Sequence, residues 1–327
     1  MQKGFFLLFI CMLALAGLGQ DATTTKRFIR IYEDNDGINA LFKGQDWGYT
    51  NGTRLDYFSP RKKQEPGLHQ KKRIFSPKYA TNGWSLLQVM ITPKKTFPFI
   101  PDKNDYPYAG ALMVIHTRHK ADPVNKRNLQ TEWVAGVMGP PALVEQTQVF
   151  LHRLIGDPRP NGWDYQLPAD VLLNYNLTYE KQVAGKNKLI LVAGVNGFAG
   201  TLSDALSVYS IIRFQKNLSY FSGLASQYFP VNQKKPGLAF SVKPSLDAVL
   251  YNALLDGGLF NSKSPIHDNN AKSGSDLRRK KIQARLDIML HVSFRQFSLS
   301  FTQKAYSPDY KNYCGHKVGN VSLCVGW

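Results

Sequence analysis

Residues 286–301 of this 327-residue chain read LDIMLHVSFRQFSLSF. Apolar side chains occupy every second position from Leu286 to Phe294, and the alternation resumes at Phe297 after Arg295-Gln296. A period of two residues is typical of a β-strand with one apolar face. The stretch therefore predicts two strands of roughly ten residues, joined by a tight turn and apolar on one side only.

The same pattern recurs along the chain. Twelve candidate strands lie near residues 27–34, 48–58, 83–92, 108–118, 130–139, 169–181, 187–198, 204–215, 237–250, 281–294, 296–305 and 319–327. An even number of strands of this length is typical of a bacterial outer-membrane barrel. A soluble β-sandwich also alternates, so the pattern alone leaves that architecture open.

The C-terminus favours the barrel. Val321, Leu323 and Val325 alternate up to the final residue, Trp327, and a last strand that ends in an aromatic residue resembles the assembly signal of outer-membrane proteins. A strand in hydrocarbon must pair along both edges, so the sheet must close. We therefore expect an all-β fold, a 12-stranded antiparallel transmembrane β-barrel with both termini on the periplasmic side.

The N-terminus reads as a secretory signal. Lys3 provides a short positive region, and the apolar run from Phe5 to Leu18 ends in small residues. The run is too short for a stable membrane-spanning helix. We expect residues 1–20 to be a signal peptide, residues 21–327 to form a single barrel domain, and the bacterial outer membrane to be its location.

The net charge of +18 invites a nucleic-acid interpretation. The basic runs lie in loop-like segments and are not interleaved with stacking aromatics, which argues against nucleic acid. An anionic membrane surface is one partner for them, and solvated loops without a partner are the alternative. The basic segment 59–81 falls on the periplasmic side of this topology, so either that turn is unusually long or the strand count slips there.

Two cysteines follow the signal peptide. Cys314 and Cys324 flank the start of the last strand. An even pair in an exported chain is compatible with a disulfide across the last hairpin. Two free thiols are the other interpretation, and the sequence leaves both open.

One segment breaks the strand pattern. Pro140-Pro141 and Gly156 bracket residues 141–155, and this is the punctuation of a helix. Its apolar side chains share a broad face, whereas Glu145, Gln148 and His152 form one polar stripe. We expect a short amphipathic helix in the third extracellular loop, lying against the barrel rim.

Several motifs gather at the expected outer ends of the strands. They are Asn35-Asp36, Tyr49-Thr50, Pro107-Tyr108-Ala109-Gly110, Gly136-Val137-Met138-Gly139-Pro140, Glu145-Gln146-Thr147-Gln148, His152-Arg153-Leu154-Ile155-Gly156 and Gly162-Trp163. With them, residues 33–167 resemble the lipid A 3-O-deacylases of the outer membrane. Beyond residue 167 only the rhythm of the barrel is shared.

This resemblance implies a twelve-stranded barrel that hydrolyses the 3-position ester of lipid A in a calcium-dependent way, at a site between the barrel wall and a loop helix. By motif position, His152 matches the catalytic histidine, and Asn35, Thr50 and Gln148 match other site residues. Asp36 matches the calcium ligand. The implied partners are lipid A, or lipopolysaccharide, and the outer membrane.

The implied chemistry is coherent. Neutral imidazole is a suitable base near pH 7, so His152 would take a proton from water. Calcium prefers oxygen ligands and would stabilise the oxyanion, although Asp36 alone makes only a weak site. Gln148, one turn before His152, would orient the base or bind substrate.

Taken without the resemblance, these residues also have plain interpretations. A histidine on a polar helix face is often only solvated, Asn35-Asp36-Gly37 is ordinary turn chemistry, and Thr50 fits any strand. Two positions depart from the family pattern. Lys94 and Lys95 stand for its basic residues in an uncertain register, and Pro158 stands where the family has an acidic residue.

The sequence therefore predicts a monomeric outer-membrane hydrolase that removes the 3-O-linked acyl chain of lipid A. Two rivals stay open. An outer-membrane phospholipase would share the barrel size and calcium use, but it relies on a serine–histidine pair, and no convincing pair is present. A non-enzymatic pore or adhesin would make His152 incidental.

Overall fold

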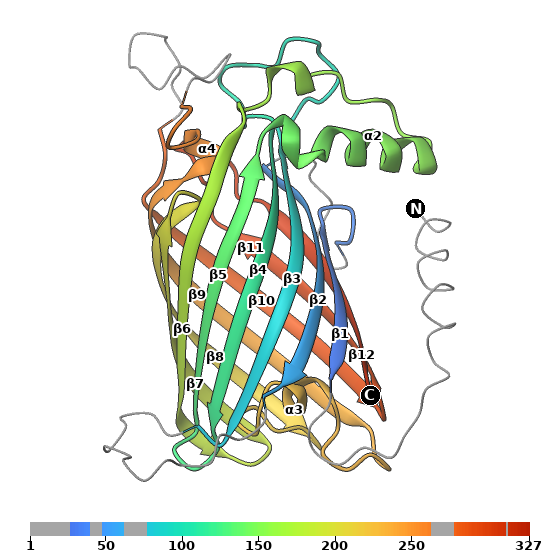
Figure 1. The fold of residues 1–327 in the computed structure, drawn as a ribbon, viewed down its shortest axis with the longest axis vertical. Helices are drawn as coiled ribbons and strands as arrows, with labels where there is room; N and C mark the ends of the chain where they lie inside the picture. Colours follow the sequence, from blue (N-terminus) through green and yellow to red (C-terminus); the bar gives the residue numbers. More distant parts are fainter. Residues whose placement is uncertain (1–26, 40–47, 62–76, 263–277, 312) are drawn as a thin grey trace.

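The computed structural model describes residues 27–39, 48–61, 77–262, 278–311 and 313–327. Twelve antiparallel strands in this part of the chain close into one barrel, in which β1 pairs with β12 (Figure 1). The strands are β1 (Phe28–Asn35), β2 (Gly48–Pro60), β3 (Tyr79–Thr92), β4 (Ala109–Asp122), β5 (Arg127–Met138), β6 (Asp170–Lys186), β7 (Leu189–Gly200), β8 (Ser203–Lys216), β9 (Gly237–Asn252), β10 (Ile282–Phe294), β11 (Phe297–Tyr306) and β12 (Lys317–Gly326). The predicted twelve-stranded all-β barrel is confirmed.

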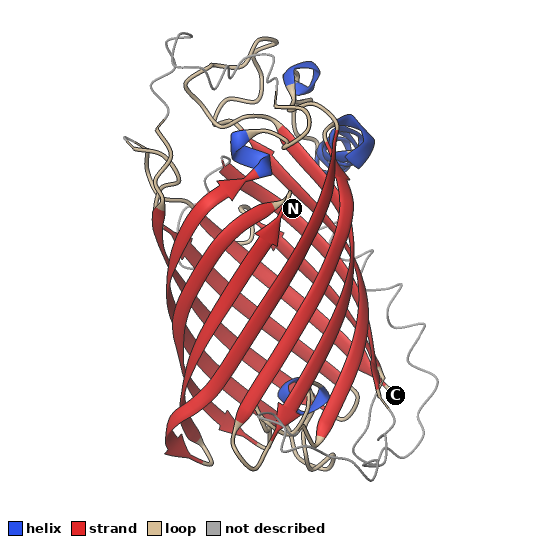
Figure 2. Cartoon of the chain, turned by 60° about the vertical axis from the view of Figure 1, so that its left-hand side comes forward, coloured by secondary structure: helices blue, strands red, loops and turns tan. Residues whose placement is uncertain are grey.

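In the described residues, five short helices lie outside the strands. They are η1 (Pro140–Ala142), α2 (Val144–Ile155), η2 (Trp163–Tyr165), α3 (Ala225–Tyr228) and α4 (Ala253–Asp256). Figure 2 shows the steeply tilted strands, with α2 at one rim of the barrel and α3 at the opposite end. No helix in the described part of the chain is both long and apolar enough to cross a membrane.

The two ends of the barrel differ in their connections. At one end β4–β5, β6–β7 and β10–β11 are joined by tight turns, although β2–β3 and β8–β9 have longer connections. At the other end every connection except the tight β7–β8 turn is a longer loop. Outer-membrane barrels place short turns in the periplasm and long loops outside. The end that carries α2 is therefore extracellular, as the sequence predicted.

The basic segment 59–81 does not disturb the strand count. It comprises the end of β2, the start of β3 and a long connection between Pro60 and Tyr79. Residues 62–76 of that connection lie outside the described residues, as do the expected signal peptide and residues 263–277 of the β9–β10 loop. The first of the two interpretations, an unusually long turn, is the correct one.

The strands present apolar side chains outward. On β10, Leu290 is 55% exposed, whereas the next residue, His291, is 2% exposed. Outward-facing aromatic pairs add to this surface, with Trp133 and Tyr175 ring centroids 4.7 Å apart on β5 and β6. This alternation suits a wall with hydrocarbon on one side and a polar lumen on the other.

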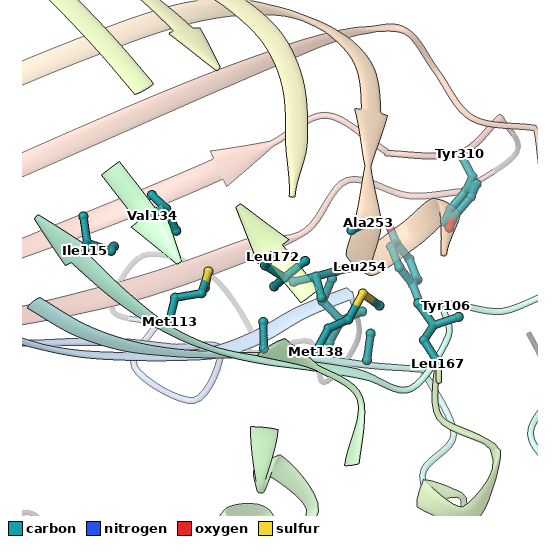
Figure 3. Packing of buried hydrophobic residues seen from close by; sticks show 13 residues of the cluster. Tyr106, Met113, Ile115, Val134, Met138, Leu167, Leu172, Ala253, Leu254 and Tyr310 are labelled. Atoms are coloured by element: carbon teal, nitrogen blue, oxygen red, sulfur yellow. The ribbon is translucent and has the colours of Figure 1, made fainter. Parts of the chain in front are cut away.

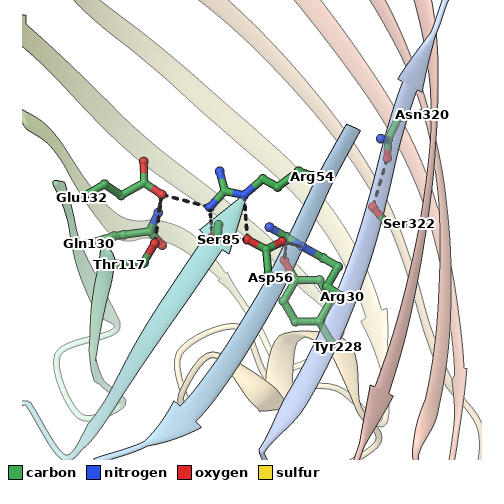
Figure 4. Close-up of polar contacts among 10 residues, drawn as sticks. All are labelled: Arg30, Arg54, Asp56, Ser85, Thr117, Gln130, Glu132, Tyr228, Asn320 and Ser322. Carbon is green, nitrogen blue, oxygen red and sulfur yellow. Dashed lines mark hydrogen bonds and ion pairs between the residues drawn. The ribbon is translucent and has the colours of Figure 1, made fainter. Parts of the chain in front are cut away.

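The lumen is filled by charged and polar side chains. Asp56 accepts hydrogen bonds from Arg30 Nε at 2.7 Å and Arg54 Nε at 2.6 Å (Figure 4). Arg54 also lies 3.4 Å from the Glu132 carboxylate on β5. A fully buried carboxylate is stable only when it is paired in this way. The network ties the walls of the barrel together across its interior.

Both ends of the lumen are packed. At the extracellular end, Ala253 and Leu254 of α4 join a buried apolar cluster with Met138 and Leu172 (Figure 3). At the periplasmic end, the segment that carries α3 packs against Phe28 and Phe58, while Tyr228 O–H accepts a hydrogen bond from Arg30 Nη1 at 2.6 Å. The side chains of these two clusters therefore fill both ends of the lumen, where an open pore would hold water.

The structure settles the two cysteines and refines the helix. Cys314 is exposed, Cys324 is buried, and both are free thiols, so the disulfide interpretation is wrong. The helix begins at Val144 rather than at residue 141, because Leu143 adopts a left-handed conformation with φ 57° after the 3₁₀ turn η1. Gly156 ends the helix at φ 79°, as the sequence predicted.

Candidate active site on the outer wall

Helix α2 lies outside the barrel, against the outer face of its wall. Val144 at the start of the helix is buried over Gly110 of β4, where a Cβ atom would come within 2.5 Å of Val144 Cγ2. Met90 of β3, Tyr108 and Trp163 complete the apolar cluster beneath it. Only glycine at position 110 lets the helix approach the wall this closely. The helix therefore sits at the extracellular edge of the lipid-facing surface (Figure 1).

The wall-facing stripe of α2 carries Gln148 and His152. Val144, Gln148 and His152 follow one another at i, i+4 and i+8, so they share one face. Gln148 is buried, and its Oε1 accepts a hydrogen bond from Trp163 Nε1 at 2.7 Å. The sequence identified the stripe but missed Trp163 as the residue that holds Gln148.

His152 is half-buried and is held by the loop that follows it. Its Nδ1 lies 2.7 Å from the carbonyl oxygen of Pro158. A carbonyl only accepts, so this contact assigns the proton to Nδ1 and leaves the lone pair on Nε2. Gly156 turns the chain back after α2, which brings Pro158 over the helix. A backbone carbonyl therefore holds the imidazole through Nδ1.

Asn35, Asp36 and Thr50 form a second group at the extracellular ends of β1 and β2. Asn35 pairs with Asn51 across the two strands, and Asp36 N–H donates to Thr50 O at 3.2 Å. The Asn35 Oδ1 accepts from Gly37 N–H at 2.8 Å, which closes the predicted turn. Asp36 is buried. Residues that are apart in the sequence therefore meet at one strand end, as their shared position predicted.

Thr50 sits at a β-bulge between Tyr49 and Asn51. Its hydroxyl lies 2.6 Å from the hydroxyl of Thr92, the last residue of β3. A bulge re-aims a side chain relative to the regular alternation, and here it sets two hydroxyls side by side. Thr92 had no distinguishing signal in the sequence, because only the pairing of β2 with β3 brings it to Thr50.

The two groups meet on β3. Met90 packs beneath α2, and Thr92, two residues further along the same strand, bonds Thr50. The structure thus brings Gln148 and His152 together on α2, and Asn35, Asp36 and Thr50 together on the wall. Met90 and Thr92 are adjacent outward positions of β3, so the two groups lie on neighbouring parts of the same outer wall.

Asp34 is set apart from this site. Its carboxylate faces the lumen, where it accepts from Lys304 Nζ and from Tyr49 O–H, each at 2.8 Å. The next outward-facing residues on either side of it are Glu33 and Asn35. The alternation of the strand therefore separates a lumen carboxylate, neutralised by a lysine, from the residues on the outer wall.

The loop after β3 carries the two candidate basic residues. Lys94 and Lys95 are both exposed at the extracellular rim, just past Thr92. The Lys94 backbone N–H donates to Asp105 Oδ2 at 2.8 Å. Tyr108 O–H donates to Thr96 O at 3.1 Å, and burial raises the pKa of Tyr108 to about 12, which keeps it a donor. The loop is therefore tied down beside the site.

The site has an all-oxygen set of groups that could hold a cation. Asp36 has a buried carboxylate and is joined to Thr50 through its backbone N–H, while Thr50 and Thr92 have paired hydroxyls. In the described part of the chain, no group of three or more His, Cys, Asp and Glu side chains is arranged to hold a metal. This donor set fits a weakly bound hard cation such as calcium, and it does not fit zinc.

A separate cavity of about 390 Å³ lies inside the barrel. Arg213, Lys243 and Lys304 line it together with His291. His291 is hydrogen-bonded at both ring nitrogens, to Ser300 Oγ at 2.7 Å and to Tyr228 O at 2.9 Å. It faces the lumen as the sequence indicated, and these bonds leave neither nitrogen to act as a base.

The fold and the outer-wall helix define this chain as an outer-membrane β-barrel. The model of the family "Outer membrane protein LpxR" matches residues 5–327. The chain therefore belongs to the LpxR family.

One solved structure agrees with this assignment at the level of the fold. The chain superposes on LpxR from Salmonella typhimurium with a TM-score of 0.72 and 15% sequence identity, covering 91% of this chain and 99% of that one. The β-domain of the Bordetella autotransporter BrkA follows with a TM-score of 0.47 and 8% identity, over 93% and 99% of the two chains. None of the curated proteins matches this sequence.

Proposed function

We propose that this chain is a calcium-dependent lipid A 3-O-deacylase of the outer membrane, with His152 as the general base. The proposal rests on the hydrogen bonding and position of the His152 imidazole. Nδ1 is engaged by the Pro158 carbonyl, so Nε2 keeps its lone pair on a helix that lies against the lipid-facing wall. Family membership supplies the substrate class.

The position of the site suits a lipid substrate. The exposed apolar residues Phe150 and Leu154 lie on α2, and Phe97 and Phe99 lie on the neighbouring loop. An apolar helix flank at the edge of the barrel belongs at the boundary between head groups and acyl chains. An ester of an outer-leaflet lipid would reach α2 without leaving the membrane.

His152 performs the proton transfers. Nε2 takes a proton from a water molecule as the water oxygen bonds to the ester carbonyl carbon. The tetrahedral species then collapses, the bond to the sugar oxygen breaks, and the Nε2 proton passes to that oxygen. The products are the free fatty acid and a sugar hydroxyl. The Pro158 carbonyl stabilises the imidazolium that forms between the two steps.

The remaining residues orient the substrate and stabilise the negative charge that develops on its carbonyl oxygen. The Gln148 carbonyl oxygen is occupied by Trp163, which leaves its amide N–H₂ to donate to the substrate. The Thr50 and Thr92 hydroxyls provide further hydrogen bonds near the carbonyl oxygen. Calcium held by Asp36 would supply positive charge for the developing oxyanion. The exposed Lys94 and Lys95, in the loop after β3, are the candidates to contact the lipid phosphates.

We also propose that the barrel works as a monomer. Every strand is paired on both edges, because β1 closes on β12. A second copy therefore cannot add by strand pairing.

The test is the mass of lipid A from cells that express the wild type, His152→Ala or His116→Ala. His116 is an outward-facing control histidine that packs against Trp84, with ring centroids 4.6 Å apart. We expect loss of one ester-linked hydroxyacyl chain with the wild type and with His116→Ala, but not with His152→Ala. Unchanged lipid A with release of phospholipid fatty acid would favour a phospholipase, and no change in either lipid would favour a non-enzymatic barrel.

A further inference from the structure

At one level of the lipid-facing wall, three neighbouring strands carry polar side chains in place of apolar ones. Across β1, β2 and β3, one outward row reads Ile31, Leu55 and Leu86. One step towards the extracellular side, the row reads Glu33, Thr53 and Gln88. The same level stays apolar on both flanks, with Val321 on β12 and Leu112 on β4. We call Glu33, Thr53, Gln88 and the adjoining Asn51 the polar notch.

The notch is a built structure. Glu33 accepts from Asn51 Nδ2 at 2.5 Å through Oε1 and from Thr53 Oγ1 at 2.7 Å through Oε2. Gln88 Nε2 donates to Ala142 O at 2.8 Å, which ties the notch to the foot of α2. Asn51 is buried. Two side chains therefore hold one carboxylate in a fixed orientation on the outside of the barrel.

The carboxylate retains capacity to accept. Each carboxylate oxygen accepts two hydrogen bonds, and one on each is taken by Asn51 or Thr53. Among the described residues, no cation lies within ion-pair distance of Glu33. A carboxylate on a lipid-facing surface is unfavourable. The wall would be more stable with an apolar residue here, so Glu33 indicates a ligand.

The position of the notch defines that ligand. Asn35 is the next outward residue on β1 after Glu33, and two residues of a strand span about 7 Å. The notch thus lies one step into the membrane from Asn35 and Thr50. If the ester of an acylated sugar is held beside Asn35 and Thr50, a neighbouring group of the same lipid lies at the level of Glu33. That group is either the amide N–H next to the ester or a hydroxyl on the acyl chain. Both groups are hydrogen-bond donors.

We infer that Glu33, held by Asn51 and Thr53, binds a hydrogen-bond donor of the acylated sugar just below the ester and so sets which ester is presented to His152. The inference rests on the proposed function. Glu33 is a specificity-determining residue in this account. It recognises the lipid and takes no part in the transfer of protons.

Binding of non-hydrolysable ether analogues to the purified barrel in detergent tests this role. The parent analogue carries the amide and the chain hydroxyl, a second lacks the hydroxyl, and a third carries an N-methyl group in place of the amide hydrogen. The variants are Glu33→Gln, Glu33→Leu and Thr53→Val. Thr131→Val, at an outward position of β5, is the matched control. Glu33→Leu restores the apolar row, so it keeps the barrel stable.

We expect Glu33→Gln and Glu33→Leu to weaken binding of the parent analogue ~10-fold or more, the size of a charge-assisted hydrogen bond. The loss should vanish for the analogue that lacks the responsible donor, which identifies the hydroxyl or the amide. Equal weakening for all three analogues, or none, would overturn the inference. If Glu33 selects for one donor but the protein does not hydrolyse the ester of lipid A, the proposed function is wrong and the role of Glu33 in lipid binding is still supported.

Discussion

His152 Nδ1 lies 2.7 Å from the carbonyl oxygen of Pro158. Because of this contact, Nδ1 holds the ring in place and Nε2 is the nitrogen that accepts the proton in the proposed reaction. Asparagine places its amide nitrogen near the position of Nδ1 and lacks a group at Nε2. His152→Asn should therefore fold as the wild type does and lose ~10²–10⁴-fold in deacylation rate. Lipid mass and the heat-modified gel migration of the barrel provide the two readouts.

The Trp163–Gln148 hydrogen bond gives a second prediction. Trp163→Phe keeps most of the ring and leaves the buried Gln148 Oε1 without its donor. An unsatisfied buried acceptor costs about 1–3 kcal/mol, so we expect the rate to fall ~10-fold as Gln148 reorients. Trp133→Phe, at an exposed position on the outer wall, is the matched control. Equal effects of the two changes would contradict a role for Trp163 at the site.

Gly110 should control the seating of α2. Gly110→Ala places a Cβ atom 2.5 Å from Val144 Cγ2, so the helix must move away from the wall. We expect activity to fall steeply while the barrel still assembles, and Val144→Ala added to Gly110→Ala to restore part of it. Gly197→Ala, where a Cβ would meet nothing within 4 Å, should behave as the wild type. Failure of the double variant to recover would argue against helix seating.

The paired hydroxyls of Thr50 and Thr92 can be tested by a double-mutant cycle. Each change to Val removes one partner of the 2.6 Å contact. If the two act as one unit, the double variant should lose little more activity than either single variant. Thr50→Ser should keep most of the wild-type rate, because the hydroxyl remains. Simple additivity of the two losses, measured on lipid A in micelles, would show that they act separately.

Calcium removal tests the role of Asp36. Chelation should abolish deacylation by the wild type, and added calcium should restore it. Asp36→Asn should need a higher calcium concentration for half-maximal rate, because it loses the only carboxylate assigned to the ion. A wild-type rate that is unchanged in chelator would remove calcium from the proposal while leaving His152 in place.

His316 gives the barrel a pH dependence. It is buried in the last extracellular loop, stacked on Tyr306 with ring centroids 4.4 Å apart, and burial lowers its pKa. The unfolded chain takes up a proton below about pH 6.5, which the folded protein resists. The free energy of unfolding should therefore fall as pH drops below about 6.5, by at most about 1.4 kcal/mol per unit. His316→Gln should weaken this dependence in thermal unfolding measurements.

The strands were predictable because their cause is local. Each strand between hydrocarbon and a polar lumen must alternate, so Leu286–Phe294 could be interpreted without knowing its neighbours. The helix from Val144 to Ile155 was predictable for a similar reason, since proline and glycine mark its ends. The predicted start of this helix at residue 141 was wrong, because the left-handed turn at Leu143 depends on the packing of η1 against the wall.

The partners of the site residues were beyond the sequence. Thr92 reaches Thr50 only through the register of β2 and β3 and the bulge between them. Trp163 reaches Gln148 only because the loop folds back beneath the helix. Glu33 looked like any strand residue until the rows of the sheet placed it on an otherwise apolar surface.

The sequence by itself determined a closed, lipid-facing barrel with a helix in its third outer loop, because hydrophobic alternation and backbone hydrogen bonding in a membrane permit little else. The tertiary structure alone decided which polar groups meet. Contacts such as Thr50 to Thr92 and His152 to Pro158 depend on register and loop path. Register and loop path are set by the packing of the whole wall, and neither produces a periodic pattern in the sequence.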